Sequence, residues 1–566
     1  MKLGKFSRQD LSFVTKVRVN LVIFLFLLVI VVTSSFIGFH QYSENHQPKL
    51  PPIPSHPDIP QQPLLTFQKS LLVKTPVDLS AYQNSTCAPL AKNWVAQENK
   101  KPGLALTMND WAKIDISNPY GSVLWLNKTS VSCGETVDIH ASLYSTHSPD
   151  FVKGDRTIAV IRIGWYNGSG GREIWRSQPT SLKAERIPFA SSGFRMIETK
   201  WKTTLSLHIG NDWKPGFYLV TTISPTGKIE GAAPLIVRSP TASSSLVLVH
   251  STLTWTAYNI FGGRSLYFGP GNTPAAKNAE RSRVSSMDRP IVGSGAIHIQ
   301  RDGIALVQYL EMEGFNVDQI ADTDLDQWPS LATNYHGMIF SGHAEYFTRR
   351  EFQATMAARN NGVNLLFLGG NTAYWQTRVA ASPSGKYRHV IVYRDAKTDP
   401  IINPYQATIQ FADKRINTPG SLLTGGTTEG VHVYGDLYPY EIPNWLHIPV
   451  STELIGWASD SEIEGMGKGK AEPPNVHIIF EGMMKLRDAW KLTATVKGRI
   501  PRAQSIWFTT PSGAAVFNAG ITLWPCDLLP SCSVTRMTPS SRASLQEVTR
   551  QILLLWQQKE IGRKLQ

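Results

Sequence analysis

The stretch 337-GMIFSGHAEYFTRRE-351 decides how the rest of the chain is interpreted. It begins with a short apolar run, which is typical of a buried strand. Its last four residues, Thr348–Glu351, have the spacing of a capping box and predict that a helix begins there. Between them lie His343, Glu345 and Tyr346, whose side chains can bind a metal or move protons. A turn after a buried strand is where open α/β sheets place their sites.

The segments around this turn repeat an alternation of strand and helix. Apolar runs at 246–249 and 364–368 predict two further buried strands, and 302–314 predicts a helix that ends at Gly314. Right-handed crossovers make such strands parallel, so their carboxyl ends lie along one edge of the sheet. The sequence therefore predicts an α/β domain over residues 244–566, with its functional side chains gathered at that edge.

Residues 81–238 follow a different pattern. Alternating apolar positions at 131–143 and further runs at 157–165 and 216–220 predict short strands, and the glycine-rich segment 167–171 predicts a turn between two of them. No convincing long helical pattern separates these strands. They favour an all-β, immunoglobulin-like sandwich that precedes the α/β domain.

The first 80 residues divide into three predicted parts. Residues 1–19 are basic and predict a cytoplasmic tail, and 20–39 contain no charged residue and are long enough to cross a bilayer as a helix. Residues 40–80 predict a proline-rich linker. The apolar run is long for a cleavable signal peptide and no Ala-x-Ala site follows it. An uncleaved signal anchor is therefore favoured, giving a single-pass membrane protein with an extracytoplasmic body.

Bulk properties restrict the class of protein. A chain of 566 residues exceeds what one hydrophobic core usually serves. The net charge of +13 is scattered and no recognised nucleic-acid-binding motif accompanies it, so we expect no nucleic-acid partner. Four cysteines in an exported body predict disulfides, and of the three connectivities we expect the local pairs Cys87–Cys133 and Cys526–Cys532.

The turn at 341–347 restricts the chemistry. The cysteines lie outside the repeated strand–helix units and Ser341 is not in a G-x-S-x-G context, which argues against a nucleophilic mechanism. The imidazole, carboxylate and phenol at 343–346 suit iron or zinc, which can activate water for amide or ester hydrolysis. A purely structural interpretation also stays open, in which Glu345 caps the following helix and His343 and Tyr346 pack in the core.

Three ordered motifs carry a resemblance to a known family. They are 254-TWTAYN-259 with 262-GGRSLY-267, then 341-SGHAEYF-347, then 369-GGNTAYWQTR-378. Together they resemble the C-terminal domain of the large (β) subunit of N,N-dimethylformamidase, over about residues 244 to 530. The resemblance implies a glutaminase-like α/β core and a mononuclear iron that is held by two tyrosines and a glutamate.

The resemblance also implies roles for individual residues. Tyr346, in the matching H-x-E-Y motif, is the metal ligand that carries over. Tyr309 in the preceding helix is a candidate for the second tyrosine, and Glu429 is a candidate for the glutamate. His343 and Glu345 are the predicted catalytic residues, which handle protons or orient the metal.

Five residues on the same edge of the sheet are predicted to bind substrate: Trp255, Tyr258, Asn259, Asn371 and Trp375. Two functions stay open. One is a membrane-anchored, metal-dependent amide (C–N) hydrolase with a small-molecule amide as its substrate. The other is a non-catalytic cell-surface protein that binds glycan or envelope material with the same aromatic side chains.

Overall fold

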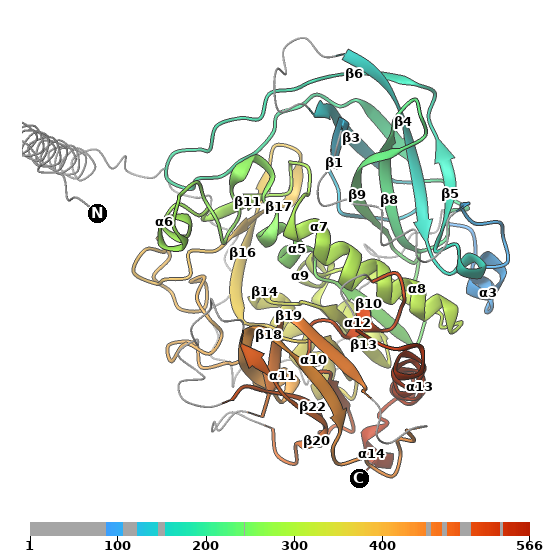
Figure 1. Cartoon of the computed structure of the whole chain (residues 1–566), viewed down its shortest axis with the longest axis vertical. Helices are drawn as coiled ribbons and strands as arrows, with labels where there is room; N and C mark the ends of the chain where they lie inside the picture. The colour runs from blue at the N-terminus through green and yellow to red at the C-terminus, as the bar shows by residue number, and fades with distance from the viewer. Residues whose placement is uncertain are drawn as a thin grey trace, which may run out of the picture. The chain divides into compact units, whose positions relative to one another are not determined.

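The computed structural model combines helices with several β-sheets, which places the protein in the predicted α/β class (Figure 1). The residues that it describes are 87–105, 121–144, 153–242, 244–448, 454–466, 473–486, 500–532 and 536–565. The predicted cytoplasmic tail, anchor and linker at 1–19, 20–39 and 40–80 lie outside them.

The expected localisation needs correction. In the described part of the chain, no helix is both long enough and apolar enough to cross a membrane. This finding contradicts the prediction of a single-pass membrane protein with an extracytoplasmic body.

A ten-stranded sheet forms the centre of the α/β region, and five neighbouring strands in it are parallel. In spatial order these are β12 (Val317–Ala321), β10 (Leu246–His250), β13 (Gly337–Gly342), β15 (Asn364–Gly369) and β23 (Ala515–Asn518). The parallel pairing of β10, β12, β13 and β15 confirms the prediction that these strands run in one direction, with their carboxyl ends along one edge.

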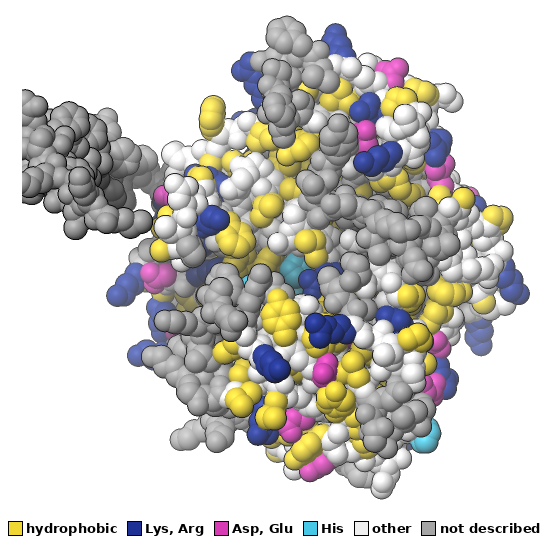
Figure 2. All heavy atoms as spheres, in the orientation of Figure 1, with side chains coloured by type: hydrophobic (Ala, Val, Ile, Leu, Met, Phe, Trp, Pro, Cys, Tyr) yellow, Lys and Arg dark blue, Asp and Glu magenta, His cyan; other side chains and the backbone are white. Residues whose placement is uncertain are grey.

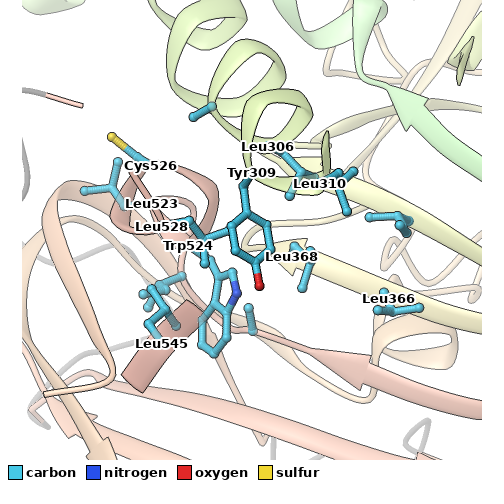
Figure 3. Packing of buried hydrophobic residues seen from close by; sticks show 14 of the residues in the cluster. Leu306, Tyr309, Leu310, Leu366, Leu368, Leu523, Trp524, Cys526, Leu528 and Leu545 are labelled. Carbon is cyan, nitrogen blue, oxygen red and sulfur yellow. The ribbon is translucent and has the colours of Figure 1, made fainter. Parts of the chain in front are cut away.

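Both faces of this parallel half are covered, which explains why its strands are continuously apolar. In β10, Leu246 and Leu248 enter one hydrophobic cluster, whereas Val247 and Val249 enter another on the opposite face. The first cluster contains the helix α8 (Ala305–Met312), and its packing against β15 is drawn in Figure 3. Burial on both faces is the usual situation of parallel strands.

Three helices match the sequence pattern. Helix α10 (Arg349–Asn360) begins after Thr348 with the predicted capping box. The helix expected at 302–314 is α8, and a π-helix, η4 (Ile299–Ile304), precedes it. The amphipathic C-terminal segment forms α13 (Pro539–Trp556), whose apolar face is core.

The rest of the large sheet is antiparallel, and its strands come from residues 427–509. It consists of β22 (Arg502–Thr509), β20 (His477–Met483), β18 (Thr427–Pro439) and β19 (Gly456–Gly465), with β21 (Lys485–Leu486) beside β18. The register of β18 against β19 shifts three times, and such bulges interrupt the two-residue alternation by which strands are predicted. These strands therefore extend the same sheet beyond its parallel half.

A smaller sheet lies next to the site. Its strands, in spatial order, are β11 (Val284–Ser286), β17 (Gly385–Ile391), β16 (Trp375–Ser382) and β14 (Tyr346–Thr348). Short helical segments complete the α/β region: α5 (Thr252–Tyr258), η3 (Phe261–Gly263), α6 (Pro274–Ala279), α7 (Ser294–His298), α9 (Asp322–Gln327), η5 (Pro329–Asn334), α11 (Ser421–Thr424), α12 (Trp524–Asp527) and α14 (Gly562–Leu565).

The N-terminal β-rich body has two sheets with a shared apolar core. One contains β1 (Gly121–Leu126), β3 (Thr136–Tyr144) and β7 (Leu205–His208). The other contains β2 (Ser130–Val131), β9 (Ile229–Val237), β8 (Gly216–Ile223), β4 (Lys153–Ile163), β5 (Gly171–Arg176) and β6 (Thr180–Lys183). The helix α3 (Trp94–Glu98) and the turn η2 (Tyr166–Gly168) accompany them. The division into domains at 81–238 and 244–566 stays a prediction.

The disulfides and the distribution of basic side chains both agree with the sequence. Both local disulfides are present, Cys87–Cys133 and Cys526–Cys532, which confirms the expected pairing. On the face shown in Figure 2, Lys and Arg side chains are scattered among acidic and hydrophobic ones. This matches the absence of long basic blocks in the sequence.

Candidate metal centre

Three segments that are far apart in the sequence meet at the carboxyl edge of the parallel strands. β10 leads into α5, β13 leads into the turn at 343–345, and β15 leads into 370–375. The backbone N–H groups of Tyr374 and Trp375 donate to the carbonyl of Glu345 over 2.9 and 3.0 Å. The turns after β13 and β15 are therefore in direct contact, as the parallel strand order predicts.

Two tyrosine hydroxyls converge on the carboxylate of Glu345. Tyr258 donates to its Oε2 over 2.9 Å, and the Tyr267 hydroxyl lies 2.5 Å from both of its oxygens. The two phenol rings are stacked, with centroids 4.3 Å apart. Glu345 is buried, so two phenols and one carboxylate point at a common place that is shielded from solvent.

His343 and Glu462 lie beside this carboxylate. Nε2 of His343 is 3.4 Å from Glu345 Oε2 and 3.3 Å from Glu462 Oε2. One ligand atom from each of the three residues lies within 4.8 Å of the other two, which makes them a group able to hold a metal ion. His343 Nε2 is buried and has no well-oriented hydrogen-bond partner in the described part of the chain.

Glu462 is supplied by β19 and held by Asn371. The Asn371 side-chain amide donates to Glu462 Oε2, and its carbonyl oxygen accepts a hydrogen bond from Thr428. Asn371 adopts a left-handed backbone with φ of 54°, a region that asparagine tolerates better than most residues. The antiparallel half of the sheet thus reaches the site through Glu462, and the turn after β15 fixes the position of its carboxylate.

The π-helix η4 supports His343 from the other side. Asp302 Oδ2 accepts a hydrogen bond from the backbone N–H of His343 over 3.2 Å, and it lies 3.1 Å from Nδ1 of His298. Gly342 has φ of +60°, and a Cβ at this position would lie 2.1 Å from Cγ of Asp302. Only glycine therefore lets the chain turn toward His343 this close to Asp302.

Burial and neighbouring charges shift the pKa values of His343, Glu345 and Glu462. Burial lowers the pKa of His343, but the charges of Glu462 and Glu345 outweigh burial and raise this pKa to about 9. Burial acts to raise the pKa of Glu462, yet the neighbouring His343 brings it below its usual value. Burial and the charge of Glu462 raise the pKa of Glu345. His343 and Glu462 therefore form a charged pair, and the ionised form of Glu345 is one that a nearby cation would stabilise.

Arg289 holds the segment that joins the two converging tyrosines. It is buried, and burial lowers the pKa of its guanidinium to about 9. The guanidinium donates to the hydroxyl of Ser285. It also donates to four backbone carbonyls, those of Asn259, Phe261, Arg264 and Ser286. Because most of these acceptors lie at 259–264, the arginine fixes the turn between Tyr258 and Tyr267.

The three predicted metal ligands make other contacts. The Tyr346 hydroxyl accepts a hydrogen bond from Arg394, and its ring meets the Tyr267 ring edge-on, with centroids 6.3 Å apart. Tyr309 belongs to the packed core around Trp524 and Leu368, and its hydroxyl donates to a backbone carbonyl over 2.6 Å (Figure 3). Glu429 is buried in β18 and is not part of the His/Glu group found among the described residues.

The expected ligand set therefore stays a prediction, and the positions of two of its members have local reasons. Residue 346 begins β14, and successive side chains of an extended chain point in opposite directions, so Tyr346 turns away from its neighbour Glu345. Tyr309 lies on the face of α8 that packs against the sheet. The predicted catalytic residues His343 and Glu345, by contrast, lie together at the centre of the site.

The predicted substrate-binding residues divide into two groups. Trp255 packs against Phe217 and His250 in the core, and Asn259 bonds to the backbone of its own and a neighbouring loop. The structure brings the other three to the site. Tyr258 and Asn371 contact the carboxylates of Glu345 and Glu462, and the Trp375 ring lies near a guanidinium group, that of Arg394.

Four residues of the site were not singled out from the sequence: Tyr267, His298, Arg394 and Glu462. Tyr267 closes the first of the three motifs and was detectable there. Glu462 is one of several acidic residues in 460–464, and nothing in the sequence distinguishes it from Glu464. His298 and Arg394 follow no motif.

No curated protein matches this chain. Among solved structures it is similar to a cycloisomaltooligosaccharide glucanotransferase from Paenibacillus sp. in complex with cycloisomaltoheptaose, at 9% identity and a TM-score of 0.17, with 72% of this chain and 71% of that chain covered. At this TM-score the likeness carries no argument about fold or function.

A family model gives a clear result. The model described as N,N-dimethylformamidase beta subunit-like, C-terminal matches residues 157–535, which is more than half of the chain. The match begins within β4 of the β-rich body, well before residue 244, where the resemblance was expected to begin. The chain therefore belongs to the N,N-dimethylformamidase beta subunit-like, C-terminal family.

Proposed function

We propose that this protein is a metal-dependent amide (C–N) hydrolase whose metal ligands are Tyr258, Tyr267 and Glu345. The convergence of two phenol oxygens on one buried carboxylate carries this proposal. The set of two tyrosines and one glutamate is also the set that the family resemblance implies for a mononuclear iron. A glutaminase-like core and an immunoglobulin-like sandwich are the corresponding proposals for the fold.

The donor atoms fit such a metal. Phenolate and carboxylate oxygens are hard, anionic ligands that suit iron, and here two phenols and one carboxylate converge in a buried place. The raised pKa of Glu345 indicates a carboxylate without sufficient positive charge around it. A bound metal would supply a Lewis acid that polarises the carbonyl of an amide substrate.

The chain's own residues would handle the protons. Hydrolysis adds water to the carbonyl carbon and breaks the C–N bond, so one proton must leave the water and one must reach the departing nitrogen. Glu462 has a lowered pKa, so it stays ionised and is able to accept the first. Protonated His343 is suited to deliver the second from Nε2, 3.3 Å from Glu462. The products are a carboxylic acid and an amine.

Metal analysis tests this proposal. Purified protein should hold about one equivalent of metal, and with ferric iron it should show a phenolate-to-metal absorption band in the visible range. Tyr267→Phe and Tyr258→Phe should each remove the band and most of the metal. Tyr346→Phe is the matched control, because the Tyr346 hydroxyl bonds to Arg394, and it should keep both. A protein without stoichiometric metal, or a loss confined to Tyr346→Phe, would refute the assignment.

A second candidate function, non-catalytic glycan binding, is favoured by one observation. A surface groove of about 780 Å³ on the antiparallel half of the sheet is lined by aromatic and charged residues, among them Tyr438, Tyr440 and Arg502. The two tyrosines are exposed, and flat exposed rings suit the apolar faces of sugars. Glycan-array binding that Tyr440→Ala abolishes, by a protein without metal, would favour this function over hydrolysis.

A further inference from the structure

Arg394 lies between two aromatic rings of the site. Its guanidinium carbon is 4.0 Å from the centre of the Tyr267 ring and 5.1 Å from that of Trp375. One of its terminal nitrogens donates to the hydroxyl of Tyr346. The side chain thus covers one face of a proposed metal ligand, and its charge lies close to the reacting centre.

The guanidinium has no direct acidic partner among the described residues. None of their carboxylates forms an ion pair with Arg394, and its Nε is buried without a hydrogen-bond partner. Arginine carries a positive charge at all relevant pH values, and such charges are rarely buried unless they are paired. Its backbone is also held at φ of 65°, a region that costs energy for a residue with a long side chain.

Two further arginines, Arg281 and Arg283, add positive charge near Arg394. Arg281 donates to the backbone carbonyls of Val392 and Tyr393, and Arg283 lies over the Tyr393 ring, 5.6 Å from its centre. Neither forms an ion pair with a carboxylate of the described residues. Glu345 is the acidic group of the site that acts on Arg394, and a metal bound to Glu345 would use up that negative charge.

We propose that Arg394 binds a carboxylate group of the substrate, so that the substrates are small amides that carry a negative charge. This assignment rests on the proposed amide hydrolysis at Glu345. Nε and a terminal nitrogen along one edge of a guanidinium match the two oxygens of a carboxylate, and such charge-assisted pairs are among the strongest hydrogen bonds in proteins. The rings of Tyr267 and Trp375 would flank the substrate's carboxylate end.

Two compounds of similar size test the proposal, N-formylalanine and the uncharged N-formylalaninamide. Formate release is measured with the metal-loaded protein, and binding is measured by titration calorimetry with and without metal. We expect N-formylalanine to be preferred in kcat/KM and in affinity. Arg394→Gln should reduce both for N-formylalanine about tenfold more than for the amide, since a hydrogen bond to a charged group is worth about a factor of ten or more.

Two further variants separate the binding role from other causes. Arg394→Lys keeps the positive charge but lacks the paired, coplanar N–H donors of a guanidinium. It should therefore retain part of the preference for N-formylalanine that Arg394→Gln loses. Arg283→Gln removes a nearby positive charge that does not face Tyr267, so it should leave the preference within about twofold of the unchanged protein. An equal effect of Arg283→Gln and Arg394→Gln would overturn the proposal in favour of a general field effect.

The outcomes also distinguish this proposal from the proposed function. Hydrolysis of both compounds at similar rates, with no selective effect of Arg394→Gln, would overturn the carboxylate site and leave the hydrolase intact. Binding of N-formylalanine that requires Arg394, without any formate release, would support the carboxylate site and count against the hydrolase. Failure of both compounds to bind would overturn the carboxylate site.

Discussion

The two halves of the large sheet contribute to the site in different ways. The parallel half contributes through the turns that follow its strands, where His343 and Glu345 lie after β13 and Asn371 lies after β15. The antiparallel half contributes through a side chain within a strand, Glu462 in β19. The candidate metal ligands come from the parallel side, and one of the two proposed proton-handling groups comes from the antiparallel side. The comparison suggests that binding the metal and moving protons are separable tasks.

Glu462→Gln gives the sharpest test of that separation. The substitution keeps the shape of the side chain and removes the group that is proposed to accept a proton from water. We expect turnover to fall about 10²-fold or more, the usual contribution of a positioned general base, while the metal content stays the same. Steady-state kinetics and elemental analysis of the same preparation measure both effects.

Glu481→Gln provides the matched control in the same half of the sheet. Glu481 lies in β20 and pairs with the exposed Arg502, away from the metal group, so the variant should keep full turnover. A Glu462→Gln protein that loses its metal together with its activity would contradict the division of tasks between the two halves.

Asn371→Ala tests the contact between the halves. The Asn371 amide holds Glu462 in place, and loss of such an outer contact usually costs about tenfold to a hundredfold in activity. We expect a decrease of about tenfold, in kcat rather than KM, together with a shift of the acidic limb of the pH profile. Asn361→Ala, at the exposed end of α10, is the control and should change neither. An effect confined to KM would mean that Asn371 contacts the substrate instead.

The smallest expected effect concerns the core that the two halves share. Ile339 in β13 and Ile479 in β20 are fully buried in the same hydrophobic cluster. Ile339→Val and Ile479→Val should each lower the free energy of unfolding by about 1 kcal/mol, because each removes one buried methylene. Chemical denaturation should show a single transition for both variants. Two separate transitions would show that the halves unfold independently.

The sequence was most informative about the parallel half. Continuous apolar runs such as 246–249 arise because both faces of these strands are covered, and a capping box marks the start of α10, so these elements could be located. The meeting of the turns after β13 and β15 followed from strand direction alone. His343 and Glu345 could be placed at the site for that reason.

The remaining site residues were beyond what pattern could reveal. Which tyrosine reaches Glu345 depends on side-chain direction and loop path. The sequence favours the adjacent Tyr346, whereas Tyr258 and Tyr267 make the contact. Glu462 belongs to a strand whose partner β18 is interrupted by bulges, and its role depends on long-range strand pairing. Such contacts depend on how distant segments pack together, and no local sequence pattern indicates them.

The hydrogen bonds from Arg289 to the turn between Tyr258 and Tyr267 have a consequence for which residues of that turn can be substituted. Its acceptors at 259–264 are backbone carbonyls, which every amino acid possesses, so these contacts of the arginine do not depend on the side chains of the turn. Substitutions at the exposed position 260 and the half-buried position 264 can then change the chemistry of the turn while the spacing between Tyr258 and Tyr267 is retained. Gly262 and Gly263, by contrast, lie at φ of 77° and 80°, where glycine is favoured. One buried arginine thereby gives this segment freedom to diverge without loss of the paired phenols.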